Sequence, residues 1–142
     1  MDPAAVVYSV QWTEPVSAGT VGGLFWGATT IEAGCVGDEY YMTRGHFHAV
    51  RDRAEYYGTV SGSGMLVLME EDGATRVEQM SPGSLHYIPG RVAHRTVNTG
   101  DVPLVFWACW PSDAGHDYAT IAEKGFGARV MRGDGTPRIV EA

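Results

Sequence analysis

Hydrophobic and polar positions alternate in short segments along the chain, and long segments with the 3.6-residue period of a helix are missing. The alternation predicts strands over residues 6–11, 24–31, 40–43 continuing into 46–48, 56–60, 74–80, 85–88, 94–97, 128–131 and 138–140. Glycine-rich and proline-rich turns separate them, for example Ser81-Pro82-Gly83 and Asn98-Thr99-Gly100-Asp101. Short strands joined by tight turns are typical of a β-sandwich or barrel, and a small barrel can enclose one ligand.

A few segments depart from this alternation. Residues 65–69 and 104–110 are continuous apolar runs, which predict buried strands and place Cys109 in the core. Asp72-Gly73 predicts a hairpin, and residues 34–39 predict a turn. Residues 117–124 form the one predicted helix, with Asp117 as its cap and Gly125 as its end.

Length and composition narrow the class of protein. A chain of 142 residues has the size of one domain, and we expect residues 1–142 to form a single domain. The net charge of −7 makes nucleic acid and anionic membranes poor partners, and a bound phosphate must rely on a few local donors. No apolar stretch is long enough to span a membrane, and the two cysteines form no close-spaced pair. We therefore expect a soluble cytoplasmic protein with reduced thiols.

Four residues suggest a metal site. On a strand, His46 and His48 would point to the same face. Glu55 lies far enough beyond His48 for the chain to bend and begin a second strand, and His94 could supply a third imidazole. Each alone is an ordinary structural or surface residue, as we expect for His86. Three imidazoles and one carboxylate together suit a first-row divalent metal with open positions, such as Fe(II), Mn(II), Ni(II), Co(II) or Zn(II).

The order of these residues and of the glycines around them resembles the cupin superfamily. The strings Thr43-Arg44-Gly45-His46-Phe47-His48, Arg53-Ala54-Glu55-Tyr56-Tyr57, Ala93-His94-Arg95-Thr96-Val97-Asn98 and Asp113-Ala114-Gly115-His116-Asp117-Tyr118 narrow the resemblance to the cupin-type phosphoglucose isomerases. The similarity runs from about Gly34 to about Gly127. It implies an all-β fold, a cupin jelly-roll barrel with one short helix near the C-terminal end.

The resemblance also implies roles for individual residues. His46, His48, Glu55 and His94 would bind one divalent metal ion per chain, with iron or manganese favoured. Thr29, Thr43 and Gly45 would lie at the sugar phosphate. Tyr57, His116 and Tyr118 would line the sugar. Trp110 stands at a substrate-binding position where the family has a tyrosine, and its indole can donate a hydrogen bond but cannot accept one.

The implied reaction is the interconversion of glucose 6-phosphate and fructose 6-phosphate in glycolysis and gluconeogenesis. Glu55 is the expected base at carbon, with His116 and Tyr57 moving protons at oxygen or assisting ring opening. A hydride shift, in which Glu55 moves only the hydroxyl proton, stays open. Other readings are a mannose-6-phosphate isomerase, a dioxygenase, or a non-catalytic metal- or sugar-binding cupin. The expected partner is a small sugar phosphate, and we expect a homodimer.

Overall fold

The computed structural model describes residues 2–142, and within that range the chain forms twelve strands and one short helix. The strands are β1 (Tyr8–Thr13), β2 (Leu24–Ile31), β3 (Cys35–Val36), β4 (Glu39–Tyr40), β5 (Glu55–Ser61), β6 (Gly64–Glu70), β7 (Thr75–Met80), β8 (Leu85–Ile88), β9 (Val92–Asn98), β10 (Leu104–Pro111), β11 (Ala128–Met131) and β12 (Arg138–Glu141). The helix is α1 (Ala119–Lys124). The predicted all-β fold with one short helix near the C-terminal end is confirmed.

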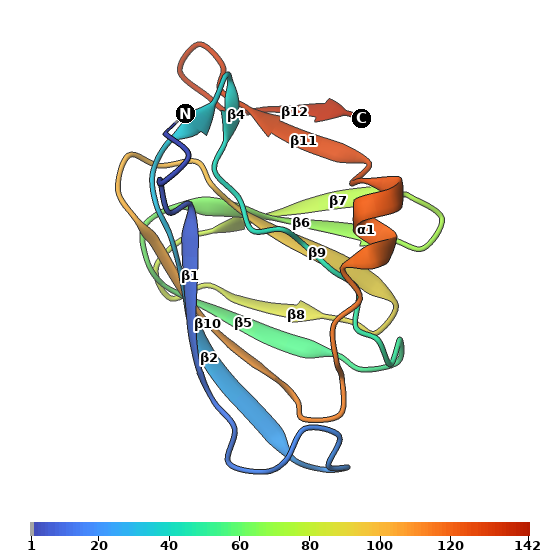
Figure 1. Cartoon of the computed structure of the whole chain (residues 1–142). Coiled ribbons are helices and arrows are strands. Elements are labelled where there is room, and N and C mark those ends of the chain that lie inside the picture. Colours follow the sequence, from blue (N-terminus) through green and yellow to red (C-terminus); the bar gives the residue numbers. More distant parts are fainter. Residues whose placement is uncertain (1) are drawn as a thin grey trace.

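The strands form three sheets arranged as layers (Figure 1). A five-stranded sheet has the order β1-β2-β10-β5-β8, and a three-stranded sheet has the order β7-β6-β9. The two sheets pack around one apolar cluster, which includes Phe106 of β10 and Leu66 of β6. The strands β12-β11-β4-β3 and helix α1 cover the other side of the three-stranded sheet through a second cluster.

This layering explains the apolar run at residues 65–69. Leu66 and Leu68 of β6 pack toward the five-stranded sheet, whereas Val67 and Met69 pack toward β11 and α1. A strand with apolar neighbours on both faces has no polar side, which removes the alternation from its sequence. The predicted buried strand is confirmed here.

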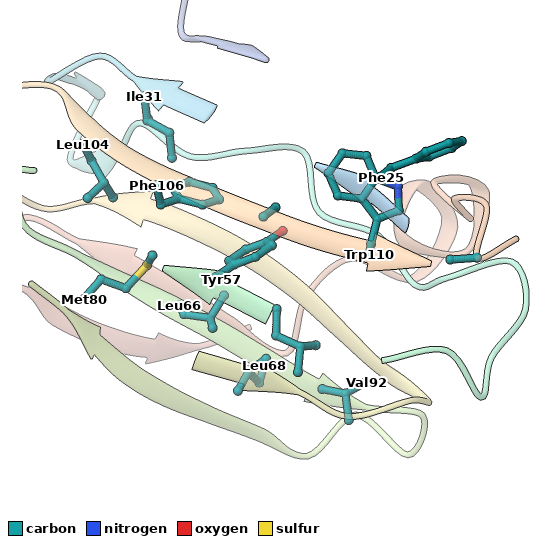
Figure 2. Packing of buried hydrophobic residues seen from close by; sticks show 13 residues of the cluster. Phe25, Ile31, Tyr57, Leu66, Leu68, Met80, Val92, Leu104, Phe106 and Trp110 are labelled. Atoms are coloured by element: carbon teal, nitrogen blue, oxygen red, sulfur yellow. The ribbon is translucent and has the colours of Figure 1, made fainter. Parts of the chain in front are cut away.

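The prediction for residues 104–110 is wrong in one respect. Strand β10 is present, but only its alternate residues face the interior, where Leu104, Phe106 and Trp110 belong to the buried apolar cluster (Figure 2). Trp107 is 48% exposed on the outer face, and Cys109 is only half-buried. The run is apolar because the outer face of this sheet carries aromatic side chains, and not because both faces are covered.

The segment that carries the two neighbouring histidines is not a regular strand, contrary to the prediction. Gly45 has a φ of 80°, which breaks the extended path, and His46 and Phe47 form single bridges to different partners, His94 and Asp117. The two imidazoles still lie on one side, with ring centroids 5.7 Å apart. The two-residue spacing therefore placed them correctly even though the secondary structure differs.

Smaller differences concern the helix and one turn. Helix α1 begins at Ala119 and not at Asp117, although the Asp117 carboxylate accepts hydrogen bonds from the Thr120 N–H and hydroxyl. Gly125 ends the helix as predicted, with a φ of 73°. Residues 34–39, predicted as a turn, include the two-residue strand β3 and the first residue of β4. In the described part of the chain, no helix has the length and apolar character needed to cross a membrane.

Candidate metal centre and adjoining cavity

Four side chains from three parts of the fold converge on one point. His46 and His48 precede β5, Glu55 is the first residue of β5, and His94 lies in β9 on the facing sheet. One nitrogen or oxygen atom from each lies within 4.8 Å of all the others. The backbone ties the two sides together, because the N–H groups of His46 and His94 each donate to the other residue's carbonyl, at 3.2 and 3.1 Å. The structure thus brings together the four predicted metal ligands.

In His48 and His94, a hydrogen bond from one ring nitrogen to a backbone carbonyl determines that the other ring nitrogen faces the centre. The Nδ1–H of His48 donates to the carbonyl of Arg53 at 2.7 Å, and the Nδ1–H of His94 donates to the carbonyl of Val92 at 3.2 Å. With the proton held on Nδ1, each Nε2 carries a lone pair directed inward. Backbone carbonyls often fix metal-binding histidines in this way.

The inward nitrogens match the chemistry of a cation site. The Nε2 atoms of His46 and His94 are buried without a hydrogen-bond partner. Glu55 Oε1 lies 3.0 Å from His48 Nε2 and 2.8 Å from His94 Nε2, the latter without hydrogen-bond alignment. Buried polar atoms normally find a partner, so lone pairs that converge beside a carboxylate fit a bound divalent cation. This group could hold one metal ion.

Burial and the neighbouring side chains set the protonation of His46 and Glu55. Burial, reinforced by the neighbouring His94, His116 and His48, moves the pKa of His46 far below its ordinary value, so its imidazole is neutral. For Glu55, burial raises the pKa, but the neighbouring His94 and His48 outweigh burial and lower the pKa to about 2. A neutral His46 and an ionised Glu55 are in the forms that bind a metal.

A cavity of about 470 Å³ opens beside these four residues. His46 and Glu55 form part of its wall, while His48 and His94 lie behind them. The wall also contains every residue that the sequence assigned to catalysis or substrate binding apart from the metal ligands: Thr29, Thr43, Gly45, Tyr57, Trp110, His116 and Tyr118. The structure therefore brings all the predicted site residues together around one space.

Aromatic rings lie close together in the cavity wall. The ring centre of His46 lies 4.6 Å from that of His116 and 5.2 Å from that of Tyr118, and the ring centres of His116 and Trp110 are 6.4 Å apart. Burial raises the pKa of Tyr57 well above its ordinary value and lowers that of His116. Near the centre the cavity therefore presents a protonated phenol and a neutral imidazole, both able to exchange protons with a ligand.

Gly45 and Thr43 form a tight part of the wall. A Cβ on Gly45 would lie 2.6 Å from Cε2 of Phe126, so only glycine fits this position without a shift. The Thr43 hydroxyl oxygen accepts from the Thr96 N–H at 3.0 Å, which leaves the hydroxyl proton free to donate. Both features suit close approach of an anionic group.

Sequence reasoning missed several residues of the cavity wall. Tyr8, Val10 and Trp12 of β1 line it, together with Arg44. The alternation of residues 8, 10 and 12 could have suggested a shared face, but the sequence does not say which face lies inward. The structure also makes His86 structural, because the buried ring contacts Ser84 and Glu78, both at 2.8 Å.

Two ion pairs connect the ligand segment to the loop that carries His116. The Arg53 guanidinium donates to both carboxylate oxygens of Asp113, at 2.9 and 2.7 Å. Arg51 donates to Asp117 and to the carbonyl of His48, both at 2.6 Å. The acidic residues flank His116 on both sides, so His116 is fixed relative to His48.

Comparison with known proteins places this site in a family. The family model described as "Glucose-6-phosphate isomerase (GPI)" matches residues 3–140. The chain is 46% identical over 135 residues to a glucose-6-phosphate isomerase of Pyrococcus horikoshii, covering 95% of this chain and 69% of the relative. The corresponding protein of Thermococcus litoralis is 47% identical over 129 residues, covering 91% and 65%. That of Sinorhizobium medicae is 41% identical over 125 residues, covering 88% and 57%. The chain thus spans roughly two thirds of the length of these relatives or somewhat less.

Solved structures agree on the fold. Oxalate decarboxylase of Bacillus subtilis superposes with a TM-score of 0.61 at 22% identity, over 79% of this chain and 28% of that chain. Peruvianin-I of Thevetia peruviana gives 0.60 at 19% identity, over 79% and 66%. The oxalate decarboxylase likeness confirms the cupin fold. With the family match over nearly the whole chain, it follows that this chain belongs to the cupin-type glucose-6-phosphate isomerase family.

Proposed function

We propose that this chain interconverts glucose 6-phosphate and fructose 6-phosphate with the help of one divalent metal ion. The observation that carries the proposal is the convergence of three imidazoles and a carboxylate at the wall of a cavity that also holds hydroxyl and phenol donors. The names of its relatives support the substrate.

His46, His48 and His94 would hold the metal through Nε2, and Glu55 through its carboxylate. A cation bound there would act as a Lewis acid that polarises the sugar carbonyl. We favour Fe(II) or Mn(II), and Ni(II), Co(II) and Zn(II) also suit this ligand set. The reaction needs no change in oxidation state.

The chain's own residues supply the proton transfers. Glu55 has the low pKa of a carboxylate that is ionised at neutral pH, so it can accept a proton from one carbon of the sugar and return it to the neighbouring carbon. Tyr57 and His116 face the same cavity and would carry protons at the sugar oxygens or assist ring opening. A hydride shift predicts no exchange with solvent, so deuterium incorporated at carbon during isomerisation in deuterated water would exclude the hydride shift and support Glu55 as the base.

The remaining wall would bind the substrate's other end. Thr29 and Thr43 offer hydroxyl donors, Gly45 allows close approach of the backbone, and Tyr118 and Trp110 flank the sugar. Trp110 would donate its indole N–H to the phosphate. These roles are proposals for this chain, drawn from its family membership and from the geometry of the cavity.

We further propose a homodimer that forms through the outer face of the five-stranded sheet. Leu24, Trp26, Tyr56, Val60, Leu85, Tyr87 and Trp107 are exposed there by 42–78%. At ~200 Å² per large side chain this amounts to about 770 Å² of surface, close to the ~800 Å² per partner of a standard interface.

A cytoplasmic location is proposed because Cys35 and Cys109 are unpaired thiols.

The test is a coupled assay of fructose 6-phosphate isomerisation on protein stripped with EDTA and resupplied with single metals. We expect activity to disappear with the chelator and to return with Fe(II) or Mn(II). His94→Ala should lose both bound metal and activity, whereas His86→Asn should keep its metal by elemental analysis. A metal-loaded protein without activity on this substrate would reject the proposal, and mannose 6-phosphate would be the next substrate to test.

A further inference from the structure

The cavity wall has a marked asymmetry of charge. Among the described residues that line it, Arg44 is the only lysine or arginine, whereas Glu14 and Glu55 are carboxylates. The whole chain is acidic, with 17 acidic and 10 basic residues. Apart from a metal ion at the proposed centre, a ligand that carries a dianion therefore meets one cationic side chain in this cavity, and the position of Arg44 restricts how the ligand can lie.

Arg44 reaches the cavity because its segment is not a strand. Thr43, Arg44 and Gly45 are consecutive, yet all three line the cavity. On a strand, successive side chains point to opposite faces, and Arg44 would point away from its two neighbours. The left-handed conformation of Gly45 breaks that alternation and puts the cation between the two residues proposed above to contact the phosphate.

Several contacts fix the position of Arg44 while leaving its guanidinium donors free. Its N–H donates to Tyr8 Oη at 3.4 Å, and its carbonyl accepts from Arg95 Nη2 at 2.9 Å. The guanidinium carbon lies 4.9 Å from the centre of the Tyr118 ring. Within the described residues the guanidinium forms no ion pair, in contrast to Arg51 and Arg53.

The two carboxylates in the cavity wall do not compete for this position. Glu55 is held between His48 and His94. Glu14 accepts from the indole N–H of Trp12 at 3.0 Å, and Trp12 lies four residues beyond Tyr8 along β1, roughly 13 Å away at 3.3 Å per residue. An anion is therefore attracted at the Arg44 end of the cavity mouth and repelled at the Glu14 end.

We propose that Arg44 binds the phosphate monoester of the substrate and selects phosphorylated over unphosphorylated sugars. The planar guanidinium can give two parallel hydrogen bonds to two phosphate oxygens, and the Tyr118 ring supports it in that orientation. Arg44 thereby fixes the end of the sugar that lies away from the metal centre. The assignment rests on the proposed isomerase function and adds its determinant of substrate class.

The first test compares Arg44→Gln and Arg44→Lys with a matched control, Arg132→Gln. Arg132 also lies over a tyrosine ring, that of Tyr40 at 5.7 Å, but it does not line the cavity. We expect Arg44→Gln to raise the KM for fructose 6-phosphate about tenfold, with a much smaller change in kcat. Arg44→Lys should give an intermediate KM because it keeps the charge and loses the paired donors. The control should match wild type.

Salt gives a second readout of the same contact. The KM of wild type should rise with NaCl because this exposed pair is screened, and the rise should be smaller in Arg44→Gln. A KM for Arg44→Gln within twofold of wild type, with an unchanged salt dependence, would overturn the assignment.

A binding measurement separates this assignment from the proposed activity. Glucitol 6-phosphate has no carbonyl and cannot react, so calorimetry on wild type and Arg44→Gln measures phosphate recognition alone. Weaker binding by the variant supports the role of Arg44. This holds even if the wild type fails to isomerise fructose 6-phosphate, because that failure would overturn only the proposed activity. Equal binding by both proteins, or none by wild type, overturns the role of Arg44.

Discussion

Glu55 has two proposed tasks, as a metal ligand and as the group that moves the substrate's proton. Glu55→Gln keeps the shape and one oxygen but removes the base. We expect the variant to keep much of its metal and to lose about 10²- to 10⁴-fold in kcat, the range that a positioned base contributes. Elemental analysis and single-turnover kinetics check the two parts separately. A near-wild-type rate would remove Glu55 as the base.

His46 makes the stability of the metal-free protein depend on pH. Its folded pKa lies far below the ordinary 6.5, mainly through burial, so as the pH falls through about 6.5 the unfolded chain takes up a proton that the folded chain does not. His116 acts in the same direction, and His48, with a raised pKa, acts in the opposite one. We expect a lower free energy of unfolding at pH 5.5 than at 7.5 in EDTA. In urea titrations, the free energy of unfolding of His46→Asn should depend less on pH than that of the wild type. An equal pH dependence in the two proteins would contradict this account.

Gly45 combines a left-handed backbone with the absence of space for a side chain. Gly73 is the matched control, because its φ is 92° and no atom lies within 4 Å of the point that its Cβ would occupy. Gly73→Ala should cost only the backbone strain, about 1 kcal/mol, whereas Gly45→Ala should cost a further ~1–3 kcal/mol for overlap with Phe126. Urea unfolding measures both, and equal losses would show that Phe126 moves aside freely.

At the scale of elements, the Arg53–Asp113 ion pair couples the loop before β5 to the loop between β10 and α1. Arg53→Gln removes its bidentate contact and frees the loop that carries His116 and Tyr118. We expect kcat to fall about 10- to 100-fold, since a displacement near 1 Å can have that effect.

Arg129 is the matched control for this pair, because it makes the same bidentate contact to Glu39 at 3.2 and 2.7 Å, away from the cavity. Arg129→Gln should change the melting temperature about as much as Arg53→Gln while leaving kcat unchanged. If both variants keep full activity, the ion pair does not position His116.

Most elements could be predicted because alternation is a local property. Strands β2, β5, β7, β8 and β9 lie where the pattern places them, within two residues. The segment before His46 could not be predicted, because its path depends on Gly45 packing against Phe126, eighty-one positions later. The four candidate ligands followed from their spacing and chemistry and from family motifs, and the substrate residues followed from family motifs alone. Tyr8, Trp12 and Arg44 could not be predicted, because the local sequence does not show which face of a strand or loop will line a cavity.

At the scale of the whole molecule, the exposed outer sheet determines the expected assembly. Trp107 lies near the middle of that face, and its ring centre is 5.4 Å from that of Trp26. Trp107→Glu should convert the proposed dimer to a monomer by light scattering, because a charge would be buried without a partner. Val36→Glu changes a 55% exposed apolar residue elsewhere and should leave the dimer intact. A monomeric wild type would contradict the proposed assembly.

The central position of β10 has a consequence for how the chain is made. Strand β10 pairs with β2 on one side and β5 on the other, and Leu104 lies opposite Ile31. At about 5–20 residues per second, a ribosome needs roughly 4–15 s to synthesise the chain between these two residues. During that time β2 and β5 expose edges that only β10 will fill. The nascent chain therefore depends on its last third to close the main sheet, and a ribosome stalled before Leu104 would hold a chain prone to aggregation.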